Sequence, residues 1–137
     1  MTTEHRYFAH DADVGVIGRG KTPEEAFVAA AEAVFSVMVD PTKIRPTTSV
    51  QVEFEEEEQE LALVTWLNAL LAEARTHRLA LARFELTRSN GRWIGRAWGE
   101  PWRDEFDRGL EVKGATLTML SVRQAGDDWE ARCVVDV

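Results

Sequence analysis

The sequence predicts an α+β domain in which two main helices pack on a mostly antiparallel sheet, giving two layers. Three patterns indicate this class. Apolar residues alternate with polar ones in segments such as 50–55, which is typical of half-buried strands. Apolar residues repeat at helical spacing in 27–38 and 61–74. Short turn sequences such as Asn90-Gly91 join later segments, and such short connections favour antiparallel pairing.

The N-terminal part of the chain predicts two strand segments followed by a helix. Residues 7–8 indicate a short opening strand, the polar residues 10–13 interrupt it, and residues 14–17 resume a strand pattern that ends at Gly18 and Gly20. The sequence then predicts where the helix begins. Thr22 suits the N-cap, Pro23 suits the first helical position, and Glu25 completes a capping box.

The first helix is expected to stop at Asp40-Pro41. An acidic residue is unfavourable at a helix C-terminus, so Asp40 needs another reason for its place, and ending the helix before Pro41 is one. The second helix is expected to fade near His77. The later segments are a strand starting near 84–86, its hairpin partner at 93–98, a loop at 99–109, an extended run at 110–122 with a break at Gly114, a turn at 126–128 and a final strand at 129–137.

Length and composition favour one self-sufficient domain over residues 1–137. Hydrophobic residues make up 45%, which excludes a disordered chain, and no apolar run is long enough to span a membrane. The first residues lack the order of a signal peptide, and the single cysteine, Cys133, fits a reducing, cytoplasmic compartment, where we expect it to be a small buried side chain.

The net charge of -8 disfavours extensive direct binding of nucleic acid, because an acidic surface repels phosphates. The charge is compatible with a basic protein partner or with cation binding. The acidic run 55–58 is interpreted as a solvated turn between a strand and a helix.

Residues 15–22 match the phosphate-loop pattern G-x-x-x-x-G-K-[ST], but this interpretation is rejected. Pro23 disfavours a helical conformation at Thr22, whereas a phosphate loop needs its Lys and Thr in the first helical turn. A strand, a turn and a capped helix account for the same residues.

Two groups of carboxylates are candidate metal ligands. Asp11 and Asp13 project to the same side of an extended segment, although a solvated turn also explains them. Asp136 is the penultimate residue of an apolar strand, so it lies beside the terminal carboxylate of Val137. Such clustered hard oxygens suit Ca²⁺ or Mg²⁺, and the alternative is a solvated chain end.

Sequence motifs for a catalytic nucleophile are lacking, and the histidines His5, His10 and His77 are too dispersed for a zinc signature. Five tryptophans have no basic clusters between them, so we expect them to pack in the core rather than to stack RNA bases.

Taken together, several segments resemble the archease family, and the resemblance covers nearly the whole chain in the same order. They are HDADVGV at 10–16, GKTPEEAF at 20–27, AAEAVFSVMVD at 30–40, LVTWLNALL at 63–71, GE at 99–100, EVKGAT at 111–116 and VVDV at 134–137.

The resemblance implies a non-catalytic protein cofactor. Archeases assist the GTP-dependent RNA ligase that joins 3′-phosphate or 2′,3′-cyclic phosphate ends to 5′-hydroxyl ends in tRNA splicing and RNA repair, by promoting its guanylylation and repeated turnover. The resemblance also implies a divalent metal, Ca²⁺ with Mg²⁺ as the alternative, at Asp13, Asp136 and the carboxylate of Val137. Lys113 matches a family lysine implicated in function.

The sequence departs from the family pattern at three places. Asp11 stands where the family usually has Thr, the segment 102–108 lacks a His that the family often has, and Leu117-Thr118 replaces Tyr-His. The leading hypothesis is an activator of an RNA ligase, without membrane association. The alternatives are a metal-dependent hydrolase that uses the same carboxylates with His10, and a metal-free chaperone-like scaffold.

Overall fold

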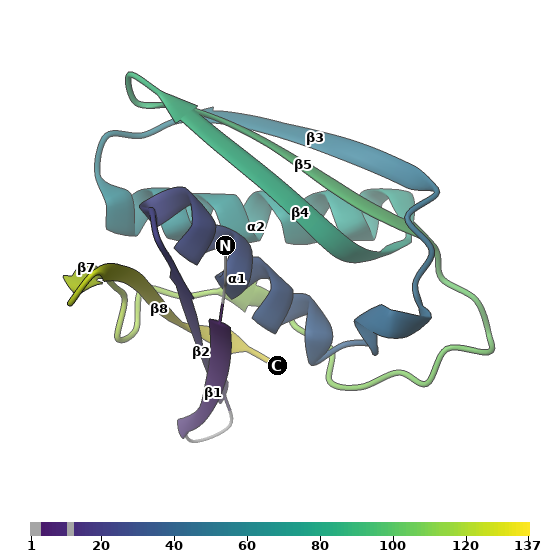
Figure 1. The fold of residues 1–137 in the computed structure, drawn as a ribbon. Helices are drawn as coiled ribbons and strands as arrows, with labels where there is room; N and C mark the ends of the chain where they lie inside the picture. The colour runs from purple at the N-terminus through teal and green to yellow at the C-terminus, as the bar shows by residue number, and fades with distance from the viewer. Residues whose placement is uncertain (1–3, 11–12) are drawn as a thin grey trace.

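The computed structural model describes residues 4–10 and 13–137, and its strands form two antiparallel sheets with the helices between them (Figure 1). The larger sheet contains β1 (Glu4–His10), β2 (Asp13–Gly20), β6 (Gly114–Ala115), β7 (Ser121–Ala125) and β8 (Asp128–Asp136). The smaller sheet contains β3 (Thr48–Glu55), β4 (Leu79–Ser89) and β5 (Arg92–Pro101). The helices are α1 (Pro23–Ser36), the short 3-10 helix η1 (Pro41–Lys43) and α2 (Gln59–His77).

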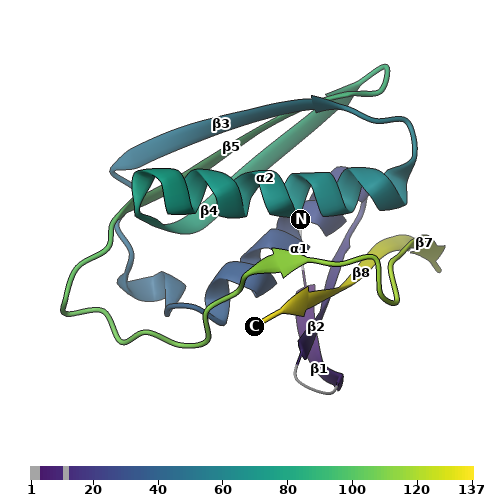
Figure 2. The ribbon, with the colours of Figure 1, turned by 180° about the vertical axis from the view of Figure 1, so that it is seen from behind.

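The strand order in the larger sheet is β1-β2-β8, and both β6 and β7 pair with the free edge of β8. The order in the smaller sheet is β3-β5-β4. Helix α1 contacts β2 and β8 on one side and β4 on the other, while α2 contacts β3, β4 and β6 (Figure 2). The predicted α+β class and the antiparallel pairing are therefore confirmed. The predicted two layers with one sheet differ from the structure, in which the helices lie between two sheets. Alternation along one strand does not reveal which strands share a sheet.

The start of α1 follows its sequence signals closely. The Thr22 hydroxyl accepts the Glu25 N–H at 3.2 Å, which confirms Thr22 as the N-cap. The Glu25 carboxylate accepts the N–H of Lys21 at 2.8 Å, one residue before the N–H that a capping box uses. The position of Asp40 is explained by η1, because the Asp40 carboxylate accepts both the N–H and the hydroxyl of Thr42 and so caps this short helix. These hydrogen bonds lower the pKa of Asp40.

The phosphate-loop interpretation is excluded by the backbone as well. Residues 15–20 belong to β2, a continuous strand between β1 and β8, and Thr22 is the cap of α1. Gly18 allows the helix to approach the strand, since a Cβ at this position would clash with the carbonyl oxygen of Ala26. The glycines thus serve helix–sheet packing.

Several boundaries differ from the sequence predictions. Helix α1 ends at Ser36, before Asp40-Pro41, and β1 covers Glu4–His10 rather than residues 7–8. Strand β4 begins at Leu79, directly after Arg78 caps α2 in the left-handed region, rather than near residue 84. Strand β5 continues to Pro101, so the prediction of a loop from residue 99 was wrong for its first residues. Within 110–122, strand structure is limited to β6 and the start of β7, and Gly114 begins β6 instead of breaking a strand. The differences in strand bounds depend on long-range pairing that no local signal encodes.

The core lies between the two sheets around two fully buried tryptophans, Trp66 and Trp93. The ring of Phe27 stacks on Trp93 at 5.1 Å, and the indole N–H of Trp66 donates to the Phe27 carbonyl at 3.0 Å. Cys133 is also buried, and burial raises the pKa of its thiol to about 11, as expected for an inert core side chain. Among the described residues, no helix has the length and apolarity needed to cross a membrane.

Candidate functional site

The predicted ligands Asp13 and Asp136 come from adjacent strands of the larger sheet. Val14 of β2 is paired with Val135 of β8, so the next position of the same register brings Asp13 opposite Asp136. Directly opposed residues of an antiparallel pair lie on the same face of the sheet. Asp136 is exposed and Asp13 is half-buried. The two aspartates, 123 positions apart in the sequence, therefore meet at one end of the sheet.

The chain terminus lies at this same end, next to the start of β2 (Figure 1). Val137 is half-buried, and its carboxylate follows directly after Asp136. In the described part of the chain, no three side chains of His, Cys, Asp or Glu come together as a metal site. Of the predicted ligands, Asp13 and Asp136 supply side chains, so they do not form a group of three by themselves.

Lys113 lies beside these carboxylates through its backbone. Its N–H donates to the carbonyl of Asp136 at 2.8 Å, and Gly114 is the strand partner of Asp136. The Lys113 side chain is exposed. The structure therefore brings Asp13, Asp136 and Lys113, which were singled out in three distant segments, to the same end of one sheet.

Two residues of α2 hold the segment that carries Lys113, and sequence reasoning did not assign them this role. Asn68 accepts the N–H of Ala115 at 2.8 Å and donates to the carbonyl of Ala115 at 3.3 Å. The guanidinium of Arg75 donates to the carbonyls of Val112 and Lys113. Asn68 and Arg75 are two turns apart on one side of α2, and polar residues at this spacing are the signal that was available. Together they fix the backbone on both sides of Lys113.

Glu100 belongs to a family-like segment and lies near the end of β5, where its strand partner is Ala80 of β4. Its buried carboxylate accepts the N–H of Arg45 at 2.5 Å and pairs with Arg103 at 3.0 Å. The hydrogen bond from Arg45 lowers the pKa of Glu100. This residue connects the segment after η1 to the end of β5, which is a structural role. In the loop that lacks the family His, Arg108 instead lies over the ring of Trp102 at 4.2 Å.

A cavity of about 950 Å³ opens between the ends of α1 and α2, strand β4 and the loop before Lys113. Apolar residues such as Leu71 and Val112 line it, together with the three arginines Arg75, Arg78 and Arg108. Of the other candidates, His10 is the strand partner of Asp13 in the pairing of β1 with β2, and Asp11 lies outside the described residues.

A family model for the archease protein family (MTH1598/TM1083) matches residues 5–137. This chain belongs to the archease family. The archease of Sulfolobus acidocaldarius is 33% identical over 138 residues, which cover 98% of this chain and 99% of that protein. The archease of Pyrobaculum neutrophilum is 35% identical over 140 residues, which cover 98% of this chain and 95% of that protein.

Two solved structures have a similar fold. The solution structure of Methanobacterium thermoautotrophicum protein 1598 superposes with a TM-score of 0.85 at 27% identity, over 97% of this chain and 98% of that one. A Thermotoga maritima crystal structure, described as an archease and possible chaperone, superposes with a TM-score of 0.66 at 20% identity, over 95% of this chain and 94% of that one. The second likeness supports the fold.

Proposed function

We propose that this archease is a non-catalytic cofactor of a GTP-dependent RNA ligase. It would promote guanylylation and multiple turnover of a cytoplasmic ligase that joins 3′-phosphate or 2′,3′-cyclic phosphate ends to 5′-hydroxyl ends, in tRNA splicing and RNA repair. The observation that carries the proposal is the meeting of Asp13, Asp136 and Lys113 at one end of the sheet, in a chain of this family.

The donor set at this end suits a hard divalent cation. Asp13, Asp136 and the Val137 carboxylate offer oxygen ligands alone, the type that Ca²⁺ and Mg²⁺ prefer, and irregular geometry favours Ca²⁺. Three carboxylates in one place repel one another unless a cation neutralises them. A bound ion would supply a positive centre able to attract a phosphate group of a partner's nucleotide.

Lys113 adds a mobile cation on a fixed backbone. Asn68 and Arg75 hold the main chain of residues 112–115, so the exposed ammonium is presented from a defined point next to Asp136. A lysine of this kind can contact a phosphate-bearing nucleotide or a carboxylate of the partner. The acidic remainder of the domain complements a ligase surface that must be basic to bind RNA.

The test is a guanylylation assay of the cognate ligase with labelled GTP, without RNA, with and without this protein. We expect faster guanylylation with the wild type and no RNA joining by the chain alone. Lys113→Ala should lower the stimulated rate at least about tenfold, which corresponds to about 1.4 kcal/mol in the activation free energy. The melting temperature should stay unchanged. Lys43→Ala, at an exposed lysine of η1, is the matched control. Stimulation by Lys113→Ala equal to that of the wild type would contradict this role.

A further inference from the structure

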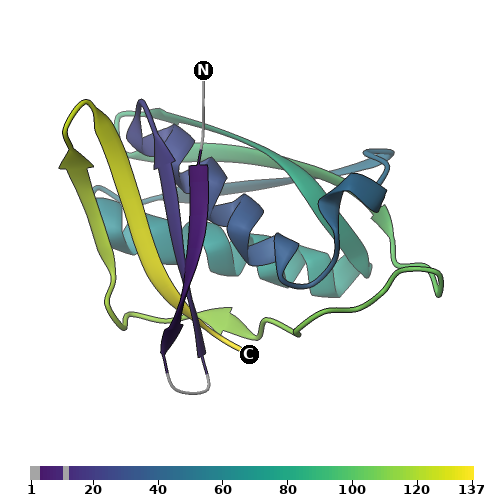
Figure 3. The same ribbon diagram turned by 60° about the horizontal axis from the view of Figure 1, so that its bottom comes forward.

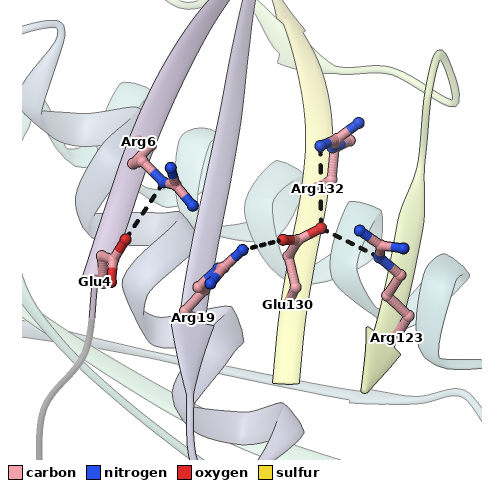
Figure 4. Close-up of polar contacts among 6 residues, drawn as sticks. All are labelled: Glu4, Arg6, Arg19, Arg123, Glu130 and Arg132. Carbon is pink, nitrogen blue, oxygen red and sulfur yellow. Dashed lines mark hydrogen bonds and ion pairs between the residues drawn. The ribbon is translucent and has the colours of Figure 1, made fainter. Parts of the chain in front are cut away.

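The outer face of the larger sheet, which points away from the helices, carries a group of arginines. In Figure 3 this face is turned toward the viewer and both helices lie behind it. Gly18 packs on α1, so the neighbouring Arg19 points to the outer side. The paired positions on the other strands share that side, as Figure 4 shows. We call Arg6, Arg19, Arg123 and Arg132 the arginine face.

One carboxylate is shared by three of these arginines. The side chain of Glu130 is only 3% exposed, and its oxygens lie 2.8 Å from Arg19, 3.3 Å from Arg123 and 4.0 Å from Arg132 (Figure 4). Burial opposes ionisation of Glu130, but the hydrogen bonds and charges of Arg19 and Arg123 outweigh it and lower the pKa of this carboxyl. Glu130 is therefore a fixed negative centre that assembles guanidiniums from three strands.

The guanidiniums at the two rims of this face remain accessible. Arg6 pairs with Glu4 at 3.3 Å, and both side chains are 54% exposed. Arg123 is 64% exposed, and its contacts within the described chain use only Nε, so both Nη atoms stay available to a ligand. Next to this group Lys21 and Asp128 pair with each other at 2.8 Å, and the carboxylates that the described ion pairs place on the four arginines are those of Glu4 and Glu130, in a chain whose net charge is -8. The local surplus of positive charge opposes the charge of the whole molecule.

The arrangement of the face suits an extended anion. The arginines come from β1, β2, β8 and β7, which are consecutive neighbours, and strands about 4.8 Å apart spread them over about 14 Å. Guanidinium groups bind phosphate oxygens in a bidentate manner. Contacts would go to a backbone and be independent of sequence.

We propose that the arginine face binds the phosphodiester backbone of the RNA on which the ligase acts. This inference rests on the proposed function, because it takes the partner to be an RNA-binding enzyme. The ligase surface that holds RNA must itself be basic, so it repels the arginine face and attracts the acidic remainder of this protein. RNA phosphates held by the ligase have the charge that the arginine face complements. Arg19 is six residues from Asp13 along β2, about 20 Å, so one face can contact RNA while its other end contacts the ligase.

The test compares two double variants that remove the same charge. Arg6→Gln/Arg123→Gln alters the rims of the arginine face, and Arg83→Gln/Arg92→Gln alters exposed arginines of the smaller sheet. Binding of a labelled single-stranded RNA of about 20 nucleotides is measured by fluorescence anisotropy over a range of salt concentrations. We expect the first variant to bind at least about tenfold more weakly at low salt, with a salt slope smaller by about 1.4. The control should stay within about twofold of the wild type. Arg6→Lys/Arg123→Lys keeps the charge and secures the test if the glutamine variant fails to fold.

Three results would overturn the inference. One is equal RNA affinity of the arginine-face variant and the wild type. Another is the lack of RNA binding by the wild type at low salt. A third is binding of polyglutamate in preference to RNA, which would assign the face to an acidic protein partner. Guanylylation of the ligase without RNA separates this inference from the proposed function. Stimulation that persists in Arg6→Gln/Arg123→Gln together with lost RNA binding supports both, whereas a wild type that does not stimulate guanylylation contradicts only the proposed function.

Discussion

The outer faces of the two sheets are both rich in arginine, but the carboxylates that pair with these arginines differ in their exposure to solvent. On the smaller sheet, Arg83 pairs with Glu85 at 3.5 Å and Arg92 pairs with Glu53 at 2.7 Å, and these carboxylate side chains are at least 41% exposed. On the larger sheet, a single carboxylate that is 3% exposed serves three arginines. On the smaller sheet, therefore, each of these arginines has an exposed carboxylate partner. The larger sheet has a buried anion and a surplus of cations.

Because of this difference in exposure, ion pairs that look alike contribute differently to stability. Exposed pairs contribute about 0–1 kcal/mol, because water screens them and two long side chains lose freedom. On the larger sheet the carboxylate is buried and its arginines are partly exposed, so losing the hydrogen bonds to this charged group costs about 1.5–3 kcal/mol. We therefore expect Glu130 to contribute more to the free energy of unfolding than any single carboxylate on the outer face of the smaller sheet.

The largest expected effect is that of Glu130→Gln. This substitution keeps the shape and leaves Arg19, Arg123 and Arg132 close together without their anion. We expect the free energy of unfolding to fall by about 1.5–3 kcal/mol, because hydrogen bonds to a charged group are lost while the arginines stay in part solvated. Glu53→Gln, the matched control on the smaller sheet, should cost no more than about 1 kcal/mol. Urea denaturation of both variants measures the two losses, and equal losses would remove the distinction between the faces.

The same contrast has a pH dependence. Because the folded-state pKa of Glu130 is lowered, its contribution to stability is complete above the ordinary value of 4.5 and is lost as the pH falls through the lowered value. The difference in unfolding free energy between the wild type and Glu130→Gln should therefore be constant near neutrality and shrink below about pH 4.5. Denaturation series between pH 7 and pH 2.5 test this, and a difference that does not change with pH would contradict it.

Cation binding sharpens the comparison at the other end of the larger sheet. Asp13 and Asp136 meet there beside the chain terminus, whereas Glu53 and Glu55 of β3 are both paired with Arg92. We expect Asp136→Asn to weaken Ca²⁺ binding at least about tenfold, while Glu53→Gln/Glu55→Gln leaves it unchanged. A short extension after Val137 should weaken binding similarly, because it converts the terminal carboxylate into an amide. Isothermal titration calorimetry decides, and full affinity in the extended chain would exclude Val137 as a ligand.

Local signals predicted the parts of the fold that local interactions determine. Thr22 caps α1 through a hydrogen bond to a residue three positions away, and Asn90-Gly91 turns a hairpin with both residues at positive φ. The division into two sheets depends on pairing between distant strands, such as β2 with β8, and a pattern within one segment does not contain that information.

The candidate site was predictable in part for the same reason. Asp13, Lys113 and Asp136 stood out through family-like segments, but their meeting required the register of three strands. Asn68 did not stand out, because its partner is the backbone of Ala115. Glu130 was missed because strand alternation assigns it to a polar outer face. Its burial arises from arginines on β2, β7 and β8, which only the folded sheet assembles.

The smallest expected effect concerns Arg83, whose exposed contacts are typical of the smaller sheet. Arg83 lies over the ring of Trp98 at 4.9 Å and also pairs with Glu85. A cation–π contact at an exposed site is worth about 0.5–1 kcal/mol, and an exposed ion pair has a similar upper limit. Double-mutant cycles of Arg83→Ala with Trp98→Leu and with Glu85→Ala should each give a coupling of no more than about 1 kcal/mol.

A matching cycle of Arg19→Ala with Glu130→Ala should give a coupling well above both, because Glu130 is buried. If the coupling of Arg83 with Glu85 equalled that of Arg19 with Glu130, exposure of the carboxylate would not be what separates the two faces. The shared, buried carboxylate would then not explain why the arginines of the larger sheet form a stable group. The arginine face would need another basis for its surplus charge, such as the accessible guanidiniums of Arg6 and Arg123 alone.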